Sequence, residues 1–326
     1  MKRMYQYIKI PGKELKYEGR GRDRSKFWDK GKWDTFINPL IPEEAVDLPF
    51  LEIGSNSGLM LKLAEDRGFR KVIGVEAHPE RVTTAKWYRE SIGGKYKIIH
   101  QFMDASFNWN QLPRLGLTLI SNVHYYFPIV DFGEIVASLR DRTLYCIVVS
   151  ADVGKRSGMV SPYLEDIRGF FNDWTEVGTV EGISTEDDPS PRGGMYGVIF
   201  KSNLETIDLD YWWNQALKHY SKLEHRRSHL HTTTEDFYKK VFSGEPFNIK
   251  DTDLFRYYTK DNRLSPGNAH KKLLEKKELA EDIKENGIKK LVYISKSKLE
   301  DGFSRCIIAR LLGYKRIIVK KVIQKK

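Results

Sequence analysis

A glycine-rich turn between an apolar run and a helical pattern is the segment whose residue types most clearly suggest chemistry. Residues 51–58 are L-E-I-G-S-N-S-G, and helical spacing continues over 59–66. Glycines permit a tight turn and the close approach of a ligand, while a helix start offers backbone N–H donors. The G-x-x-x-G spacing differs from the G-x-G-x-x-G of dinucleotide binders, and no Lys-Ser/Thr follows as in a P-loop. The turn predicts a nucleotide-like ligand outside those two classes.

Two acidic residues stand where later apolar runs end. Glu76 closes the run V-I-G-V-E, about 20 residues after the first glycine, where an acid accepts the hydroxyls of a ribose. Asp104 follows the run at 96–102, and an acid at that strand end bonds an adenine amino group. Either acid alone is more often a helix cap or a turn residue. Together with the turn, they indicate an adenosine-containing ligand.

Alternating strand and helix patterns surround these residues and must position them. Buried strands are predicted for five apolar runs, at 49–53, 71–75, 96–102, 117–120 and 144–149. Two more strands, at 174–180 and 195–201, are joined by a polar loop and predict an antiparallel hairpin at the sheet edge. This alternation is typical of an α/β fold, a doubly wound parallel sheet with helices on both faces.

Residues 48–202 resemble the class I S-adenosylmethionine-dependent methyltransferases through the motifs L-E-I-G-S-N-S-G, V-I-G-V-E and M-D-A. The resemblance implies a seven-stranded Rossmann-like sheet with an antiparallel final hairpin and S-adenosyl-L-methionine as the cofactor. No metal is expected, because no cysteine or H-E-x-x-H pattern accompanies His225 and His229, which are four residues apart. By position, it implies that the cofactor is bound by Glu52, Gly54, Ser55, Gly58, Glu76, Asp104, Ala105 and Asn122. Glu76 would hold the ribose hydroxyls, and Asp104 with Ala105 would meet the adenine.

The segment S-N-V-H-Y-Y-F-P at 121–128 lies beside the transferred methyl group in that family. Methyl transfer is an in-line displacement, so the protein positions the acceptor and removes a proton from a hydroxyl. His124 and Asp152 are the two candidate catalytic bases; the alternatives are a packing role for His124 and a helix cap for Asp152. Tyr125 and Tyr126 are expected to form walls of the acceptor pocket.

Two further substrate contacts are expected outside these strands. Arg192 lies in the polar hairpin loop and suits an anionic group. Residues 17–34 mix basic and aromatic side chains, so Trp28 could stack on a sugar or a base within a substrate lid. The alternative is an N-terminal helix that packs Trp28 and Trp33 on the sheet.

The acceptor is predicted by elimination. The sequence has no Asp/Asn-Pro-Pro-aromatic motif after the fourth strand, no Pro-Cys site, and no evident Lys-Asp-Lys-Glu tetrad. These absences favour O-methylation of a small polar substrate such as a sugar or glycan. One alternative is an RNA-directed methyltransferase whose basic terminal regions hold the phosphate backbone. Another is a non-catalytic nucleotide- or nucleic-acid-binding module.

Charge is concentrated toward the C-terminus. The chain carries +11 overall, and residues 203–326 carry 27 Lys and Arg against 17 Asp and Glu, whereas residues 48–202 carry 17 against 19. A basic C-terminal region is compatible with a nucleic-acid partner. Residues 276–322 resemble the ParB/sulfiredoxin-like fold through D-G-x-x-R, and that resemblance implies a phosphate site at Gly302 and Arg305. Sulfiredoxin's catalytic cysteine is missing, so reductase chemistry is not expected.

These patterns divide the chain into four expected regions. They are a substrate-side segment at 1–47, the methyltransferase domain at 48–202, a helical connector at 203–275 with Asp, Asn and Pro-Gly breaks at 251–267, and a basic α/β unit at 276–326. Two distant cysteines, no apolar run long enough for a bilayer and no signal-peptide pattern predict a cytoplasmic protein with no membrane contact. The oligomeric state is left open.

Overall fold

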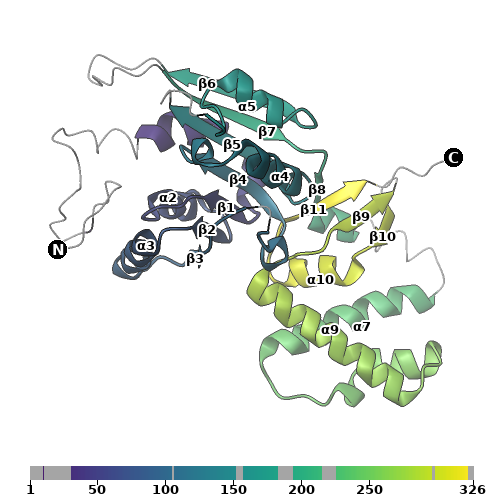
Figure 1. Cartoon of the computed structure of the whole chain (residues 1–326). Helices are drawn as coiled ribbons and strands as arrows, with labels where there is room; N and C mark the ends of the chain where they lie inside the picture. The colour runs from purple at the N-terminus through teal and green to yellow at the C-terminus, as the bar shows by residue number, and fades with distance from the viewer. Residues whose placement is uncertain are drawn as a thin grey trace. The chain divides into compact units, whose positions relative to one another are not determined.

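The computed structural model describes residue 10 and residues 31–104, 106–151, 157–182, 194–214, 225–295 and 298–321. The chain forms two compact units, shown in Figure 1. The first comprises Met1–Trp109 and Leu115–Leu204, and the second comprises Asn110–Arg114 and Glu205–Lys326. Each unit contains its own β-sheet.

A seven-stranded mixed sheet with the order β3-β2-β1-β4-β5-β7-β6 forms the first unit (Figure 1). β1 to β5 run parallel, and β7 pairs antiparallel with both β5 and β6. The strands are β1 (Phe50–Ile53), β2 (Val72–Glu76), β3 (Lys97–His100), β4 (Leu115–Ser121), β5 (Thr143–Ala151), β6 (Thr175–Gly182) and β7 (Met195–Lys201). The predicted α/β fold with an antiparallel final hairpin is confirmed.

The central strands are buried along nearly all of their length. Every residue of β1 is buried, and β5 is buried from Thr143 to Ser150, as expected of parallel strands covered on both faces. In α4 the buried residues Phe132, Ile135, Val136 and Leu139 recur at helical spacing. The helices of this unit are α1 (Glu43–Val46), α2 (Leu59–Arg67), α3 (Pro79–Ser91), α4 (Ile129–Arg140) and α5 (Leu164–Phe170).

Two short helical turns before the first strand pack on the final hairpin. They are η2 (Trp33–Ile37) and η3 (Asn38–Leu40), and both contact β6 and β7. Trp33 and Phe36 are buried. A Cβ at Gly197 would lie 2.4 Å from the Phe36 carbonyl oxygen, so this close approach requires glycine. Trp33 therefore packs on the sheet, whereas Trp28 lies outside the described residues.

A four-stranded sheet with the order β10-β9-β11-β8 forms the second unit. Its strands are β8 (Glu205–Asp208), β9 (Val292–Ser295), β10 (Lys298–Asp301) and β11 (Arg316–Lys321). β11 runs parallel to β9 and antiparallel to β8. The strands predicted near 291–295 and 316–322 are confirmed, whereas the sequence patterns predicted neither β8 nor β10.

The helices of the second unit pack on this sheet around one shared hydrophobic core. They are α7 (His225–Ser243), α8 (Asp253–Arg256), α9 (Pro266–Asn286) and α10 (Phe303–Leu311), with the turns η6 (Ile249–Asp251) and η7 (Tyr257–Asp261). Buried residues of this core run from Leu209 to Val319. The segment expected to be a connector, 203–275, therefore contributes to the same core as residues 276–321.

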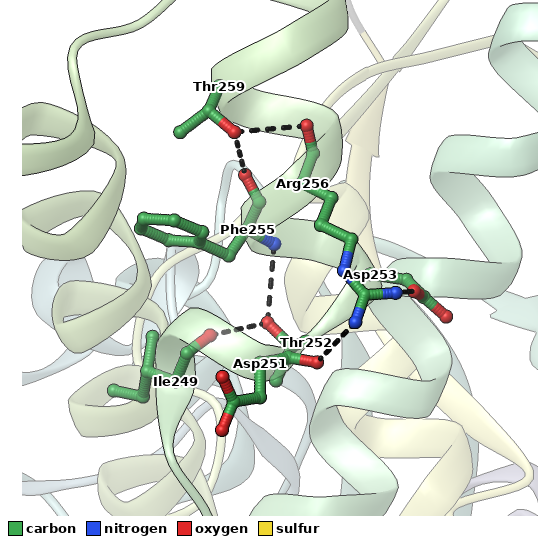
Figure 2. Close-up of polar contacts among 7 residues, drawn as sticks. All are labelled: Ile249, Asp251, Thr252, Asp253, Phe255, Arg256 and Thr259. Atoms are coloured by element: carbon green, nitrogen blue, oxygen red, sulfur yellow. Dashed lines mark hydrogen bonds and ion pairs between the residues drawn. The ribbon is translucent and has the colours of Figure 1, made fainter.

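Between α7 and α9, the side chain of Thr252 caps the start of α8 directly after η6 (Figure 2). Its hydroxyl donates to the Ile249 carbonyl at 2.7 Å and accepts the Phe255 N–H at 3.2 Å. Thr252 is buried, so both bonds are shielded from water. Arg256 closes the turn with an ion pair to Asp253 at 2.8 Å. This network starts α8 at a defined residue.

Candidate cofactor site and active site

The glycine-rich turn joins β1 to α2 in a backbone geometry that requires its first glycine. Gly54 has φ +73°, and a Cβ there would lie 2.6 Å from Val123 Cγ2. The backbone N–H groups of Gly54 and Ser55 both donate to the Val75 carbonyl, at 2.8 and 3.1 Å. The turn is thus fixed by β2 on one side and by the end of β4 on the other.

Glu76 lies at the carboxyl end of β2 and faces this turn. It is only 3% exposed. Its Oε2 accepts the Asn56 N–H at 2.8 Å, and its Oε1 accepts the His78 N–H at 2.9 Å, with Arg81 at 3.9 Å from Oε1. A carboxylate has about four acceptor positions, so these two bonds orient the group while leaving capacity for a ligand's hydroxyls.

Several buried polar atoms gather at the carboxyl ends of β1 and β4. Among the described residues, Ser55 Oγ, Ser121 Oγ and Asn122 Oδ1 have no hydrogen-bond partner. Asn122 also has φ +53°, and its N–H donates to the Val149 carbonyl at 2.9 Å. An unsatisfied buried polar group costs about 1–3 kcal/mol. Such a cluster beside buried Glu52 and Glu76 fits a polar ligand with an amino acid and a ribose part.

Asp104 is engaged within its own loop. Its Oδ1 accepts the Ser106 N–H at 2.8 Å and the Ser106 hydroxyl at 2.6 Å. This is the turn-residue role that the sequence left as an alternative. Ala105 lies outside the described residues, so the predicted adenine contact of the pair stays a prediction.

His124 is completely buried in a short turn after β4. Its ring lies 5.1 Å from that of Tyr125 and 6.3 Å from that of Phe132, between ring centroids. Burial lowers the pKa of His124 to about 3, so the imidazole is neutral at physiological pH. Neither ring nitrogen has a hydrogen-bond partner among the described residues. In this arrangement the ring offers no surface to an acceptor.

Of the other residues predicted to contact the substrate or act as its base, the structure describes only Tyr125 and Tyr126. Tyr125 is buried, whereas Tyr126 is 55% exposed, and the two tilted rings lie 4.9 Å apart between centroids. Asp152, Arg192 and Trp28 lie outside the described residues. Their roles stay predictions.

Three residues of the site were missed by sequence analysis. Asn56 supplies the N–H that orients Glu76, Ser121 adds an unpartnered hydroxyl, and Val123 packs against Gly54. Asn56 and Asn122 both have positive φ, which asparagine tolerates better than most residues. An asparagine two or three residues after a predicted strand is the sequence pattern that could have marked these two positions.

Gly302 and Arg305 lie at the start of α10 in the second unit. Gly302 has φ +101° and precedes the helix without a side-chain cap. One Arg305 guanidinium nitrogen donates to Asp301 Oδ2 at 2.8 Å and to the Leu291 carbonyl at 3.1 Å. The predicted phosphate site, like the ParB-like resemblance, stays a prediction.

Two kinds of feature are absent from the described part of the chain. No group of three or more His, Cys, Asp or Glu side chains is placed to hold a metal ion there. No helix within those residues is long and apolar enough to cross a bilayer.

No protein family model and no curated protein matches the chain. Some solved structures are similar to about half of the chain at low identity. PH0226 from Pyrococcus horikoshii OT3 is 13% identical, with a TM-score of 0.42 over 53% of this chain and 90% of its own. Magnesium protoporphyrin IX methyltransferase (ChlM) from Synechocystis PCC 6803, with bound SAH, is 14% identical, with a TM-score of 0.38 over 48% and 74%. N-methyltransferase NodS from Bradyrhizobium japonicum WM9 is 17% identical, with a TM-score of 0.39 over 47% and 85%.

The strand order of the first unit, with β7 antiparallel between β5 and β6, identifies its architecture. It has a Rossmann-like methyltransferase fold. In open α/β sheets of this kind, ligands bind beyond the carboxyl ends of the strands, where the strand order reverses. Here that position lies between β1 and β4, where the glycine-rich turn and the unpartnered polar atoms are found.

Proposed function

We propose that the first unit is a methyltransferase that binds S-adenosylmethionine at the carboxyl ends of β1, β2 and β4. The observation that carries this proposal is the buried Glu76 carboxylate, oriented by the backbone of the glycine-rich turn, next to unpartnered buried polar atoms. When bound, the cofactor supplies an electrophilic methyl group. The protein supplies position, orientation and exclusion of water.

The residues present fit that cofactor. Glu76 would accept the ribose hydroxyls through its remaining acceptor positions. Ser55 and Asn122 would bond the polar groups of the methionine part, which would satisfy atoms that are otherwise buried without partners. Gly54 lets the turn pack directly against Val123 at the end of β4, which holds the backbone of the proposed site in place. Asp104 and Ala105 are proposed to meet the adenine.

The acceptor is proposed to be a hydroxyl of a small polar molecule such as a sugar or glycan. Between the two candidate bases, the burial of His124 favours Asp152 as the group that removes the proton. His124 would then support the wall formed by Tyr125 and Tyr126. The basic C-terminal region keeps RNA as the alternative acceptor.

Calorimetric titration of the full chain with S-adenosylmethionine and S-adenosylhomocysteine tests the cofactor site. We expect micromolar binding that Glu76→Ala weakens tenfold or more, about 1.4 kcal/mol. Glu80→Ala is the matched control, because Glu80 is an exposed acid four residues later in α3. Equal binding by wild type and Glu76→Ala would contradict the assignment of Glu76. No binding by wild type would contradict the proposed function.

The salt dependence of acceptor binding separates the two acceptor classes. Each RNA phosphate contact releases counterions, so RNA binding should weaken steeply as salt rises. A neutral sugar hydroxyl carries no such dependence. Measuring the affinity of oligonucleotide and glycan acceptors at two salt concentrations decides between them.

A further inference from the structure

A lysine and a serine meet at the start of α10 in the second unit. Lys276 of α9 donates from Nζ to Ser304 Oγ at 2.7 Å. The same Nζ lies 5.9 Å from the ring centroid of Tyr238 on α7. α7, α9 and α10 pack against one another, so three core helices each contribute one polar side chain to this point.

Lys276 lies in an environment that lowers the pKa of its amine. Burial lowers the pKa of Lys276 to about 8, and the nearby charge of Lys272 acts in the same direction. Within the described residues no carboxylate forms an ion pair with Lys276, unlike Lys277, whose Nζ is 3.9 Å from Glu281. With that pKa, about a tenth of the amine is neutral at pH 7. A neutral amine next to a hydroxyl can accept its proton.

Ser304 is the second residue of α10, a position with donors for a developing negative charge. The first N–H groups of a helix have no intrahelical acceptor, and the helix dipole favours an anion at that end. The residue that precedes α10 is Gly302, which has no side chain to cap the helix. The buried Tyr238 hydroxyl lies near Ser304 and has no completed hydrogen bond among the described residues. The nucleophile and its base thus lie together at the start of α10, beside the Tyr238 hydroxyl.

We propose that Ser304 and Lys276 form a serine–lysine pair that takes an acyl group from a carboxylic ester or thioester. Ser304 Oγ forms a bond to the carbonyl carbon while its proton passes to neutral Lys276 Nζ. The bond from that carbon to the leaving oxygen or sulfur breaks, and Lys276 returns the proton to the leaving group. Water then repeats the sequence, releasing a carboxylic acid and restoring Ser304. This activity is independent of the methyl-transfer site in the first unit.

Covalent labelling of the full chain tests the pair. The probes are p-nitrophenyl acetate, followed by p-nitrophenolate release, and a fluorophosphonate, followed by intact mass and peptide mapping. We expect one adduct, on Ser304, which Ser304→Ala abolishes. Lys276→Arg should slow labelling at least 100-fold, because arginine keeps the positive charge but does not accept a proton. Lys277→Arg, the neighbouring position on α9, should label at the wild-type rate.

Two results would overturn the proposal. One is wild-type protein in which mapping finds Ser304 unmodified, or finds the adduct on Lys276 itself. The other is folded Lys276→Arg protein that labels at the wild-type rate. Thermal melting of each variant establishes folding. If Lys276→Arg does not fold, the wild-type map alone decides.

Discussion

Replacing Gly54 by alanine should destabilise the first unit through two separable effects. The backbone at Gly54 has φ +73°, where an L side chain costs about 1–2 kcal/mol. The new Cβ would also lie 2.6 Å from Val123 Cγ2, an overpacking that costs about 1–3 kcal/mol. We therefore expect Gly54→Ala to lower the free energy of unfolding by about 2–5 kcal/mol.

Gly93 provides a control that isolates the backbone effect. It has φ +66°, and no heavy atom lies within 4 Å of the position its Cβ would take. Gly93→Ala should cost only the strain of positive φ, about 1–2 kcal/mol. Val123→Ala removes the 2.6 Å contact and leaves 3.0 Å to Val123 Cβ. The double variant Gly54→Ala/Val123→Ala should therefore recover part, but not all, of the loss.

Amide hydrogen exchange in increasing urea, read by mass spectrometry, reports the two units separately. Peptides covering β1 and β4 give the free energy of unfolding of the first unit, and peptides from α9 give that of the second. The contact between the new Cβ at position 54 and Val123 would be refuted by two results together. Gly54→Ala and Gly93→Ala would lower the free energy of unfolding equally, and Val123→Ala would recover none of the loss caused by Gly54→Ala. A loss of unfolding free energy seen only in peptides from α9 would refute the assignment of the effect to the first unit.

Two further changes test other parts of the molecule. The pKa of His124 in the folded chain, about 3, lies below its ordinary value near 6.5, so the unfolded chain binds the extra proton and acid favours unfolding. The free energy of unfolding of the first unit should therefore fall by about 2 kcal/mol between pH 8 and pH 5. In urea titrations at several pH values, His124→Gln should make this free energy depend less on pH. The control His100→Gln, at an exposed histidine, should not. Thr252→Val removes both hydroxyl bonds of the cap in Figure 2 and should cost the second unit about 1–2 kcal/mol by the same exchange measurement. The control Thr259→Val should change the free energy of unfolding of the second unit by less than about 0.5 kcal/mol. Equal effects of Thr252→Val and Thr259→Val would contradict the capping role of Thr252.

The glycine-rich turn after β1 and the acid at the end of β2 could be predicted because their determinants are local. β1 is an apolar run that stops at a glycine, and Glu76 stands at the end of the next run. What local pattern does not specify is the pairing of β1 with β2, which sets Ile53 opposite Val75. That register brings the Asn56 N–H to Glu76. The burial of His124 likewise depends on Phe132 from a later helix.

The start of α9 shows how one pattern supports two interpretations. The sequence pattern predicts a break at Pro266-Gly267, because proline and glycine interrupt helices. In the structure, Ser265 caps the helix by accepting the Asn268 N–H at 3.3 Å, and Pro266 occupies its first position. Proline is favoured there because its missing N–H is not needed. The packing of the following residues, Ala269 and Leu273, then holds the helix that begins here.

β8 was missed for a different reason. Glu205–Asp208 is four residues long and none of them is fully buried, so no apolar run marks it. It becomes a strand because β11 lies beside it, with Ile317 opposite Ile207. Its structure is therefore set by residues about a hundred positions later in the sequence.

The pairing of β8 with β11 also fixes the order in which the two units can be completed during synthesis. β11 is an interior strand that joins β8 to β9, so the second sheet cannot close until residue 321 has left the ribosome. The first unit has all its strands by residue 201. In a nascent chain the first unit could therefore be complete while β8 still had no strand to pair with. Unpaired strand edges tend to associate with other chains. Translation that stops between these points would leave a chain prone to aggregate.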